Sequence, residues 1–376
     1  MSDAQFMRLA LRLARRGYGV TSPNPMVGAV LVKGGKIIGR GWHRRAGLPH
    51  AEIEALRDAQ KRGHNPRGAT LYVTLEPCCT HGRTPPCTDA IIAAGIKKVV
   101  IGTTDPNPKH AGRAFKILRC AGIEVVHRIL PDDCAQLNEA FNHWIVQRTP
   151  FVTVKAAMTL DGKIATAGGE SKWITGGKAR AFGMKLRQGA DAILVGINTI
   201  LADNPNLTAR KRMADGRWRM GKHVRRIILD SMARTPLDTK VVSDEFAALT
   251  TIIVGKYAPK NRVAALAKKV CVLVAPGRGG KIDLRWLLKK IGAENVTHLL
   301  VEGGGEVNAA FLLGGFAQRV AFFYAPKILG GRDSIKADAG EGVKNLNEII
   351  RLREIVWKRI GADLLMTALV VNGGKR

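Results

Sequence analysis

The chain contains 376 residues, of which 46% are hydrophobic and 24% charged, a composition that excludes a disordered or fibrous protein. This length suggests two globular domains. Lys and Arg number 60 against 30 Asp and Glu, which gives a formal net charge of +30. The charge is compatible with a phosphate-bearing or polyanionic partner and also with a plain solvated surface, so it does not name the partner.

No apolar run approaches the roughly 18 residues that a membrane span needs. The N-terminal residues also lack the charged and apolar regions of a signal peptide. We therefore expect a cytoplasmic protein with no membrane partner.

Helix and strand patterns alternate over residues 1–147. Asp3 is expected to cap a helix that ends by Gly17, and a turn over 33–36 predicts a hairpin. Strands are predicted over 27–32, 37–42, 70–75, 98–102 and 123–127, and helices over 51–59, 89–94, 113–120 and 131–147. This alternation predicts an α/β sandwich whose sheet is mostly parallel after the hairpin.

A hinge is predicted at residues 148–150, which separates a domain over 1–147 from one over 150–376. Beyond the hinge, strands are predicted over 151–157, 192–196, 226–230, 251–254, 270–275 and 298–302, and helices over 177–186, 261–269 and 284–291. The strand-rich segments 316–325 and 355–371 are expected to close the sheet as antiparallel edge strands. The dense basic stretch over 211–226 predicts an exposed basic loop.

The cysteines favour a metal site over a disulfide framework, because Cys78, Cys79 and Cys87 cluster in a long chain. His50 precedes a predicted helix, and Cys78 follows a predicted strand. One imidazole and two thiolates can hold zinc and leave a position for water, whose pKa zinc lowers to about 7.

Glu52 lies two residues after His50, a spacing that points the two side chains of a helix in different directions. Glu52 is therefore suited to move protons beside the metal without binding it. The spacing departs from the common H-x-E…P-C-x-x-C signature, because eight residues separate Cys78 from Cys87. Cys79 cannot easily replace Cys87, because adjacent cysteines seldom both reach one tetrahedral metal, and His81 is the competing ligand.

In the second half, Gly303-Gly304-Gly305 follows a predicted strand and precedes a helix. Such a loop lets backbone N–H groups approach a phosphate, although a tight turn would look the same. Lys155 can be a cation in a site or merely an edge lysine. These residues alone do not identify a ligand.

Several motifs of the first half resemble the deaminase half of the bifunctional riboflavin-biosynthesis deaminase–reductase family. They are Ser22 to Ala29, Gly41-Trp42-His43, His50-Ala51-Glu52, Thr74 to Cys78, and Gly82 to Cys87. The resemblance implies a cytidine-deaminase-like α/β sandwich with zinc on His50, Cys78 and Cys87, and Glu52 as proton shuttle. It further implies hydrolysis of the 2-amino group of 2,5-diamino-6-(5-phosphoribosylamino)pyrimidin-4-one. Asn24 is then expected to contact the substrate, with His43, Arg44 and residues 81–83 near its phosphate.

Motifs of the second half resemble the reductase half of the same family, whose fold is like dihydrofolate reductase. They are Val154 to Gly162, Gly169 to Thr175, Leu201 to Thr208 and Val301 to Gly305. The resemblance implies hydride transfer from NADPH that converts the ribose of the deaminated product to a ribityl chain. Lys155 and Asp203 are the candidates for polarising the reacting group.

The same resemblance assigns residues of the second half to two groups. The NADPH groove is expected to be lined by Ala157, Trp173, Thr199, Asp203, Ser231, Gly304, Gly305, Glu306, Val307, Asn308, Ala309 and Ala310. The substrate is expected to face Lys155, Ser171, Arg187, Leu207, Arg210 and Glu302.

The expected partners are small phosphorylated pyrimidines, and a homo-oligomer is expected. The alternative is an RNA-binding or RNA-editing zinc deaminase that uses the basic surface. With aromatic residues at only 5%, the chain offers few stacking platforms for a nucleic acid, which argues against this alternative.

Overall fold

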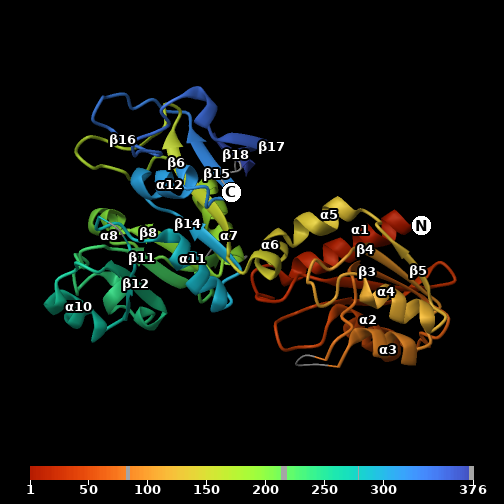
Figure 1. Cartoon of the computed structure of the whole chain (residues 1–376). Helices are drawn as coiled ribbons and strands as arrows, with labels where there is room; N and C mark the ends of the chain where they lie inside the picture. The colour runs from red at the N-terminus through yellow and green to blue at the C-terminus, as the bar shows by residue number, and fades with distance from the viewer. Residues whose placement is uncertain (82–84, 213–217, 278, 372–376) are drawn as a thin grey trace. The chain divides into compact units, whose positions relative to one another are not determined.

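The computed structural model describes residues 1–81, 85–212, 218–277 and 279–371. The chain divides into two compact units, Met1–Arg148 and Thr149–Arg376, each of which is described here by itself (Figure 1). Within the described ranges, no helix is long and apolar enough to cross a lipid bilayer.

Unit 1 is built on a sheet with the strand order β2-β1-β3-β4-β5. The β1 strand is antiparallel to its neighbours, whereas β3, β4 and β5 run parallel, as the sequence predicts. The strands are β1 (Gly28–Lys33), β2 (Lys36–Trp42), β3 (Thr70–Leu75), β4 (Lys98–Thr103) and β5 (Glu124–His127). The helices are α1 (Asp3–Ala14), α2 (Ala51–Lys61), α3 (Cys87–Ala93), α4 (Arg113–Cys120), α5 (Pro131–Leu137) and α6 (Glu139–Gln147), and the 3-10 turn η1 (Arg15–Gly17) follows α1.

Alternate residues of the unit 1 strands face two separate cores, as the two-residue repeat of a strand requires. Leu71 and Val73 pack with α2, α3 and α4 on one side, and Tyr72 packs with α1 and α5 on the other. Figure 1 shows α1 and α5 on the side of the sheet opposite to α2 and α3. The unit is therefore a three-layer sandwich in which helices cover both faces of the sheet.

Two local expectations for unit 1 are wrong. Ser2 caps α1 in place of Asp3: its hydroxyl accepts from the amide of Gln5, whose side chain accepts from the amide of Ser2. The helix expected over 131–147 breaks at Asn138. The side chain of Asn138 binds both the amide and the carbonyl of Met26, at 2.7 and 2.9 Å, and this contact with a distant segment separates α5 from α6.

Unit 2 is built on a larger sheet with the strand order β13-β12-β11-β8-β14-β6-β15-β18-β17. The strands from β13 to β15 run parallel, and β18 and β17 continue the sheet antiparallel at one edge, as expected for residues 355–371. The expectation that residues 316–325 form an antiparallel edge strand is wrong, because β15 lies inside the sheet and pairs parallel with β6. The strands are β6 (Phe151–Thr159), β8 (Ala192–Gly196), β11 (Arg225–Leu229), β12 (Thr250–Gly255), β13 (Cys271–Ala275), β14 (His298–Val301), β15 (Arg319–Ala325), β17 (Arg351–Ile360) and β18 (Asp363–Val371).

Smaller elements surround this sheet. Two short ribbons pair β7 (Lys163–Ala165) with β16 (Ile335–Lys336), and β9 (Ala209–Arg212) with β10 (Trp218–Lys222). The helices are α7 (Gly177–Gly189), α8 (Ile197–Asp203), α9 (Lys240–Ser243), α10 (Lys260–Ala267), α11 (Leu284–Ala293) and α12 (Gly305–Leu313), with 3-10 turns η2 (Ala247–Leu249) and η3 (Leu346–Glu348).

The stretch expected to be an exposed basic loop is instead partly ordered and partly buried. Its described residues belong to the β9–β10 ribbon and to the start of β11, while residues 213–217 lie outside the described part. The side chain of Arg226 is 1% exposed and binds both carboxylate oxygens of Asp244 at 2.7 Å. A basic residue can be buried when a carboxylate from another part of the chain neutralises it.

Candidate active sites

The cluster in unit 1 gathers three possible metal ligands from three elements. His50 precedes α2, Cys78 lies in the loop after β3, and Cys87 is the first residue of α3. The His50 Nδ1 atom lies 3.5 Å from Cys78 Sγ and 3.4 Å from Cys87 Sγ. All three ligand atoms lie within 4.8 Å of one another.

Cys79 and the competing ligand His81 both lie outside this cluster. The sulfur of Cys79 is 3.5 Å from His110 Nδ1, and His81 is exposed. Neither residue belongs to the group that could share an ion with His50.

The donor set of this cluster fits zinc. One imidazole and two sulfurs are ligands that zinc prefers, and three protein ligands are what an open, catalytic zinc site provides. Contact with the Cys87 thiol lowers the pKa of Cys78, while contact with Cys78 raises the pKa of Cys87. When bound at such a site, zinc lowers the pKa of a coordinated water to about 7.

Glu52 adds a buried carboxylate beside these ligands. It lies in the first turn of α2, is 3% exposed, and its Oε2 atom has no hydrogen-bond partner among the described residues. Burial raises the pKa of Glu52 to about 6. A buried carboxyl group with a pKa close to neutrality is suited to accept a proton and release it again.

Asn24 is connected to the cluster through His43. The side-chain amide nitrogen of Asn24 lies 3.1 Å from His43 Nε2, and His43 Nδ1 lies 3.1 Å from the carbonyl oxygen of Pro49. Because a carbonyl only accepts, Nδ1 is the donor and the neutral Nε2 accepts from Asn24. The His43 ring contacts the His50 ring edge-on at 5.2 Å. Asn24 is therefore connected to His50 through the ring of His43.

The residues expected near the substrate phosphate are described only in part. Arg44 forms an ion pair with Glu54 at 3.0 Å and stacks on Trp42. Residues 82 and 83 lie outside the described part of the chain.

Sequence reasoning missed the role of Glu76. This residue is 3% exposed and accepts hydrogen bonds from the amides of Asp105, Gly112 and Ala114, at 3.1, 2.9 and 3.1 Å. It fixes the segment between β4 and α4 beside the loop that carries Cys78. Asp105 and His110 belong to this segment. The sequence feature that could have pointed to these residues is the run of polar residues directly after a predicted parallel strand.

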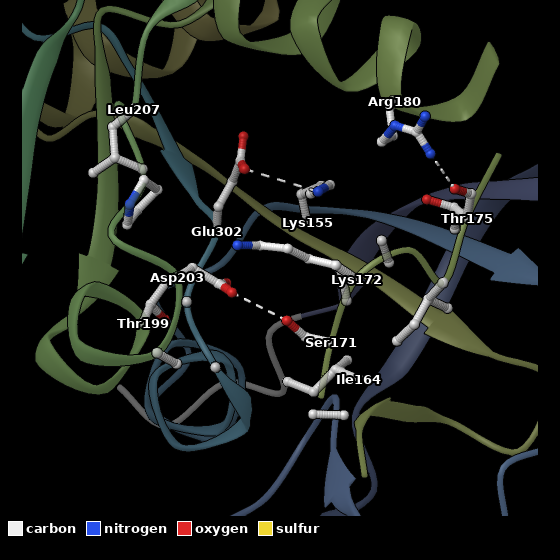
Figure 2. A pocket seen from close by; sticks show the side chains of 18 of the residues that line it. Lys155, Ile164, Ser171, Lys172, Thr175, Arg180, Thr199, Asp203, Leu207 and Glu302 are labelled. Carbon is white, nitrogen blue, oxygen red and sulfur yellow. Dashed lines mark hydrogen bonds and ion pairs between the residues drawn. The ribbon is translucent and has the colours of Figure 1, made fainter. Parts of the chain in front are cut away.

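Unit 2 contains a cavity of about 630 Å³. Lys155 from β6, Arg187 from α7 and Glu302, which follows β14, come together on its wall. Figure 2 shows Lys155 beside Glu302. The guanidinium of Arg187 binds Glu302 through two hydrogen bonds of 2.9 Å, and Lys155 Nζ lies 3.8 Å from Glu302 Oε2. Burial alone would raise the pKa of Glu302, but Arg187 and Lys155 overcome this effect and lower the pKa to about 2.

Ser171 and Asp203 form a second polar pair in the cavity, apart from the cluster around Glu302. The hydroxyl of Ser171 donates to Asp203 Oδ1 at 3.0 Å, as the dashed line in Figure 2 marks. The loop that carries Ser171 is thereby connected to the end of α8. Lys172, Arg180 and Thr175 also line the cavity, and sequence reasoning did not assign them.

The cavity includes every residue of unit 2 that was expected to face the substrate: Lys155, Ser171, Arg187, Leu207, Arg210 and Glu302. Of the residues expected to line the NADPH groove, it includes Ala157, Trp173, Thr199, Asp203, Gly304 and Asn308. The others, Ser231, Gly305, Glu306, Val307, Ala309 and Ala310, are not among its described lining residues. Ser231 follows β11, and the rest belong to α12.

The cavity suits a nucleotide cofactor. It lies at the carboxyl ends of the parallel strands β8 and β14, where ligands of open α/β sheets bind. Gly303 and Gly304 line it, and the buried Oδ1 atom of Asn308 has no partner among the described residues. When bound in such a cavity, a nicotinamide dinucleotide supplies a hydride.

Comparisons with known families divide the chain in the same way. The family described as "Cytidine and deoxycytidylate deaminase zinc-binding region" matches residues 1–103, and the family described as "RibD C-terminal domain" matches residues 150–366. Together with the two sites, these matches define the class of the protein: a zinc-dependent deaminase joined to a reductase.

Full-length relatives identify the family. The chain is 43% identical to riboflavin biosynthesis protein RibD of Actinobacillus pleuropneumoniae, over 99% of this chain and 96% of that protein, and 44% identical to RibD of Aquifex aeolicus, over 97% of each. The chain belongs to the RibD family. It is a bifunctional deaminase and reductase of riboflavin biosynthesis that uses Zn²⁺ and NADPH, as its sequence motifs imply.

Solved structures agree over the whole chain. RibD of Acinetobacter baumannii superposes with a TM-score of 0.85 at 34% identity, covering 98% of this chain and 99% of that one. The Thermotoga maritima diaminohydroxyphosphoribosylaminopyrimidine deaminase/5-amino-6-(5-phosphoribosylamino)uracil reductase gives 0.82 at 36% identity, with the same coverage. The expected fold class is thus confirmed, and the RNA-editing alternative has no support in these comparisons.

Proposed function

We propose that unit 1 hydrolyses the 2-amino group of 2,5-diamino-6-(5-phosphoribosylamino)pyrimidin-4-one, with His50, Cys78 and Cys87 as zinc ligands. The convergence of these three side chains beside a buried carboxylate supports the proposal. The substrate assignment rests on the name of the Thermotoga maritima relative, which is 36% identical over 98% of this chain.

In this proposal, Glu52 is the group that moves protons. Its Oε2 atom takes one proton from the attacking water and delivers it to the pyrimidine ring nitrogen. It then takes the second proton from the newly added hydroxyl and delivers it to the amino group, which leaves as ammonia while the carbonyl forms. Burial keeps solvent away from this carboxylate, and no protein donor within the described part competes for Oε2. Asn24 orients the substrate while its amide remains connected to His43.

We further propose that the unit 2 cavity binds NADPH and the deaminated product side by side. Ser171 and Asp203 hold one wall in position, and Lys155 faces the reacting ribose from the opposite wall. Because Glu302 is ion-paired with both Arg187 and Lys155, it fixes the ammonium group of Lys155 in place. Lys155 and Asp203 then polarise the reacting group, Leu207 and Arg210 contact the substrate, and Ser231 and the start of α12 contact the cofactor.

We also propose a homo-oligomer and a cytoplasmic location. The edge strand β17 exposes Ile355, Val356 and Trp357, at 52%, 58% and 58%, and an apolar edge strand favours pairing with another chain. Light scattering should report a lower mass for Val356→Lys than for the wild type. The free cysteines of the metal cluster suit a reducing compartment.

Replacing Glu52 by Gln tests the deaminase assignment. The change keeps the size of the side chain but removes its capacity to take up a proton. We expect ammonia release from the diaminopyrimidine to fall by about 10²–10⁴-fold, the range of general acid–base catalysis. Zinc content and NADPH oxidation with the deaminated product should stay at the wild-type level.

The matched control is Glu54→Gln, because Glu54 lies on the same helix and is paired with Arg44 outside the cluster. Normal ammonia release from Glu52→Gln with full zinc content would refute the shuttle role.

A further inference from the structure

The turn that follows β11 carries a buried carboxylate, that of Asp230. Asp230 is fully buried, and its Oδ2 atom accepts hydrogen bonds from the amide and the hydroxyl of Thr235, at 2.8 and 2.7 Å. Ala233, in the left-handed region with a φ of 53°, reverses the chain within this turn. Its Oδ1 atom has no partner among the described residues, so it is burial that keeps this acidic group away from a ligand at the surface.

Arg234 extends from the same turn and is exposed. Its Nη2 atom donates to Asn198 Oδ1 at 3.0 Å, and Asn198 lines the unit 2 cavity. No carboxylate within the described ranges forms an ion pair with Arg234. The bond to Asn198 uses one of the five N–H donors of the guanidinium group, so the side chain is held beside a cavity-lining residue with donors to spare, while Arg234 itself is not among the described lining residues.

This arginine lies close to the carboxyl ends of two neighbouring parallel strands. The β11 strand pairs in parallel with β8, and Leu229 lies opposite Gly196, so the turn after β11 is adjacent to the start of α8. Ligands of open α/β sheets bind at the carboxyl ends of neighbouring parallel strands. Asn198, in the first turn of α8, connects the turn to the cavity.

Charge at this location distinguishes the two nicotinamide dinucleotides. In dinucleotide sites of this kind, an acidic residue binds the 2′-hydroxyl of NADH, whereas a nearby arginine accommodates the 2′-phosphate of NADPH. Here the acidic residue, Asp230, is buried, whereas Arg234 is exposed. We propose that Arg234 binds the 2′-phosphate and sets the preference for NADPH over NADH, a proposal that rests on the unit 2 cavity being the NADPH site.

Lys240 is the main rival for this role. It is exposed and lines the same cavity, and its backbone amide binds the side chain of Asn204. Lys240 lies at the start of α9, whereas Arg234 is held by α8. A planar guanidinium also suits a phosphate better than a single ammonium group does, because it can donate two parallel hydrogen bonds.

The test measures kcat/KM for NADPH and for NADH with the full chain and the deaminated product. In Arg234→Ala, we expect the NADPH-to-NADH ratio to fall by about 10- to 100-fold, the range of a charge-assisted hydrogen bond. The value for NADH should remain within about two-fold of the wild type, because NADH has no phosphate for Arg234 to bind. Arg234→Lys should lose less of the ratio than Arg234→Ala, since it retains the charge.

Arg262→Ala is the matched control, because it removes an exposed arginine from α10 in the same unit. It should leave the ratio unchanged. An unchanged ratio in Arg234→Ala would overturn the proposal, as would a ratio that falls with Lys240→Ala instead. An equal loss of activity with both cofactors would also overturn it, since this would show damage to the turn. A wild-type enzyme that oxidises no NADPH would instead contradict the reductase assignment itself.

Discussion

Arg187 and Glu302 form a two-pronged ion pair inside the unit 2 cavity, with both nitrogen–oxygen distances at 2.9 Å. Their side chains are only 14% and 10% exposed. The remaining Nη1 group of Arg187 donates to the carbonyl oxygen of Thr208 at 3.1 Å. Arg187 therefore supports the position of Glu302, and through it Lys155, and has few donors left for a substrate phosphate.

Replacing Glu302 by Gln should destabilise unit 2, because it leaves Arg187 buried without a counter-charge. Removing one partner of a buried pair costs on the order of 3–5 kcal/mol. The folded pKa of Glu302 is about 2 against a usual value of 4.5, so the ionised carboxylate stabilises the fold above pH 4.5. This stabilisation is lost progressively as the pH falls from 4.5 towards 2.

Denaturant unfolding of both proteins between pH 7 and pH 3, followed by a unit 2 probe, measures this effect. The difference in unfolding free energy should shrink at the acidic end. A difference that stays constant over that range would contradict the assigned pKa. The exposed Glu341→Gln serves as the control and should show no difference at any pH.

Metal content should distinguish Cys87, which is an assigned ligand, from Cys79, which is not. Cys87→Ser should lose most of the zinc, since Cys87 Sγ is one of the three converging ligand atoms. Cys79→Ser should retain zinc, because its sulfur lies beside His110. Elemental analysis of the purified proteins gives the result directly, and equal zinc loss in both variants would contradict the assigned ligand set.

Removing the metal should affect the two activities differently. A chelator should abolish ammonia release but leave NADPH oxidation with the deaminated product, because His50, Cys78 and Cys87 all belong to unit 1. Readdition of zinc should restore ammonia release. Parallel loss of both activities would mean that unit 2 depends on the metal.

Glu76→Gln should loosen the segment between β4 and α4. A carboxylate can accept from all three amides, whereas the amide nitrogen of Gln would oppose one of them. The backbone amides of Asp105, Gly112 and Ala114 should therefore exchange with solvent at least about ten-fold faster, which corresponds to roughly 1.4 kcal/mol. Hydrogen exchange followed by mass spectrometry can test this, with the β1 amides as an internal reference.

Hydrophobic periodicity was sufficient to predict much of the architecture. The parallel strands β3 and β8 have clear patterns because they are buried on both faces, each against two cores, and the helix α2 has one because it buries a single stripe against one core. The order in which strands pair did not follow from these patterns, since β6 lies between β14 and β15 although long segments separate them in the sequence.

Features that depend on one distant contact escaped prediction. The break at Asn138 depends on the backbone of Met26, and the burial of Arg226 depends on Asp244. The role of Glu76 was hidden for a similar reason, because its partners are backbone amides and every residue type except proline has one. The candidate metal ligands were accessible from sequence because their chemistry is specific to residue type.

The strand order has a consequence for the nascent chain as it leaves the ribosome. Unit 1 pairs strands that are near one another in sequence and is complete at Arg148, so its contacts can form while the rest is still being synthesised. In unit 2, the first strand, β6, must wait for β14 and β15 before either of its edges is covered. The reductase half therefore keeps an unsatisfied hydrophobic strand through most of its own translation, and this interval is where the protein is most exposed to aggregation and to chaperones.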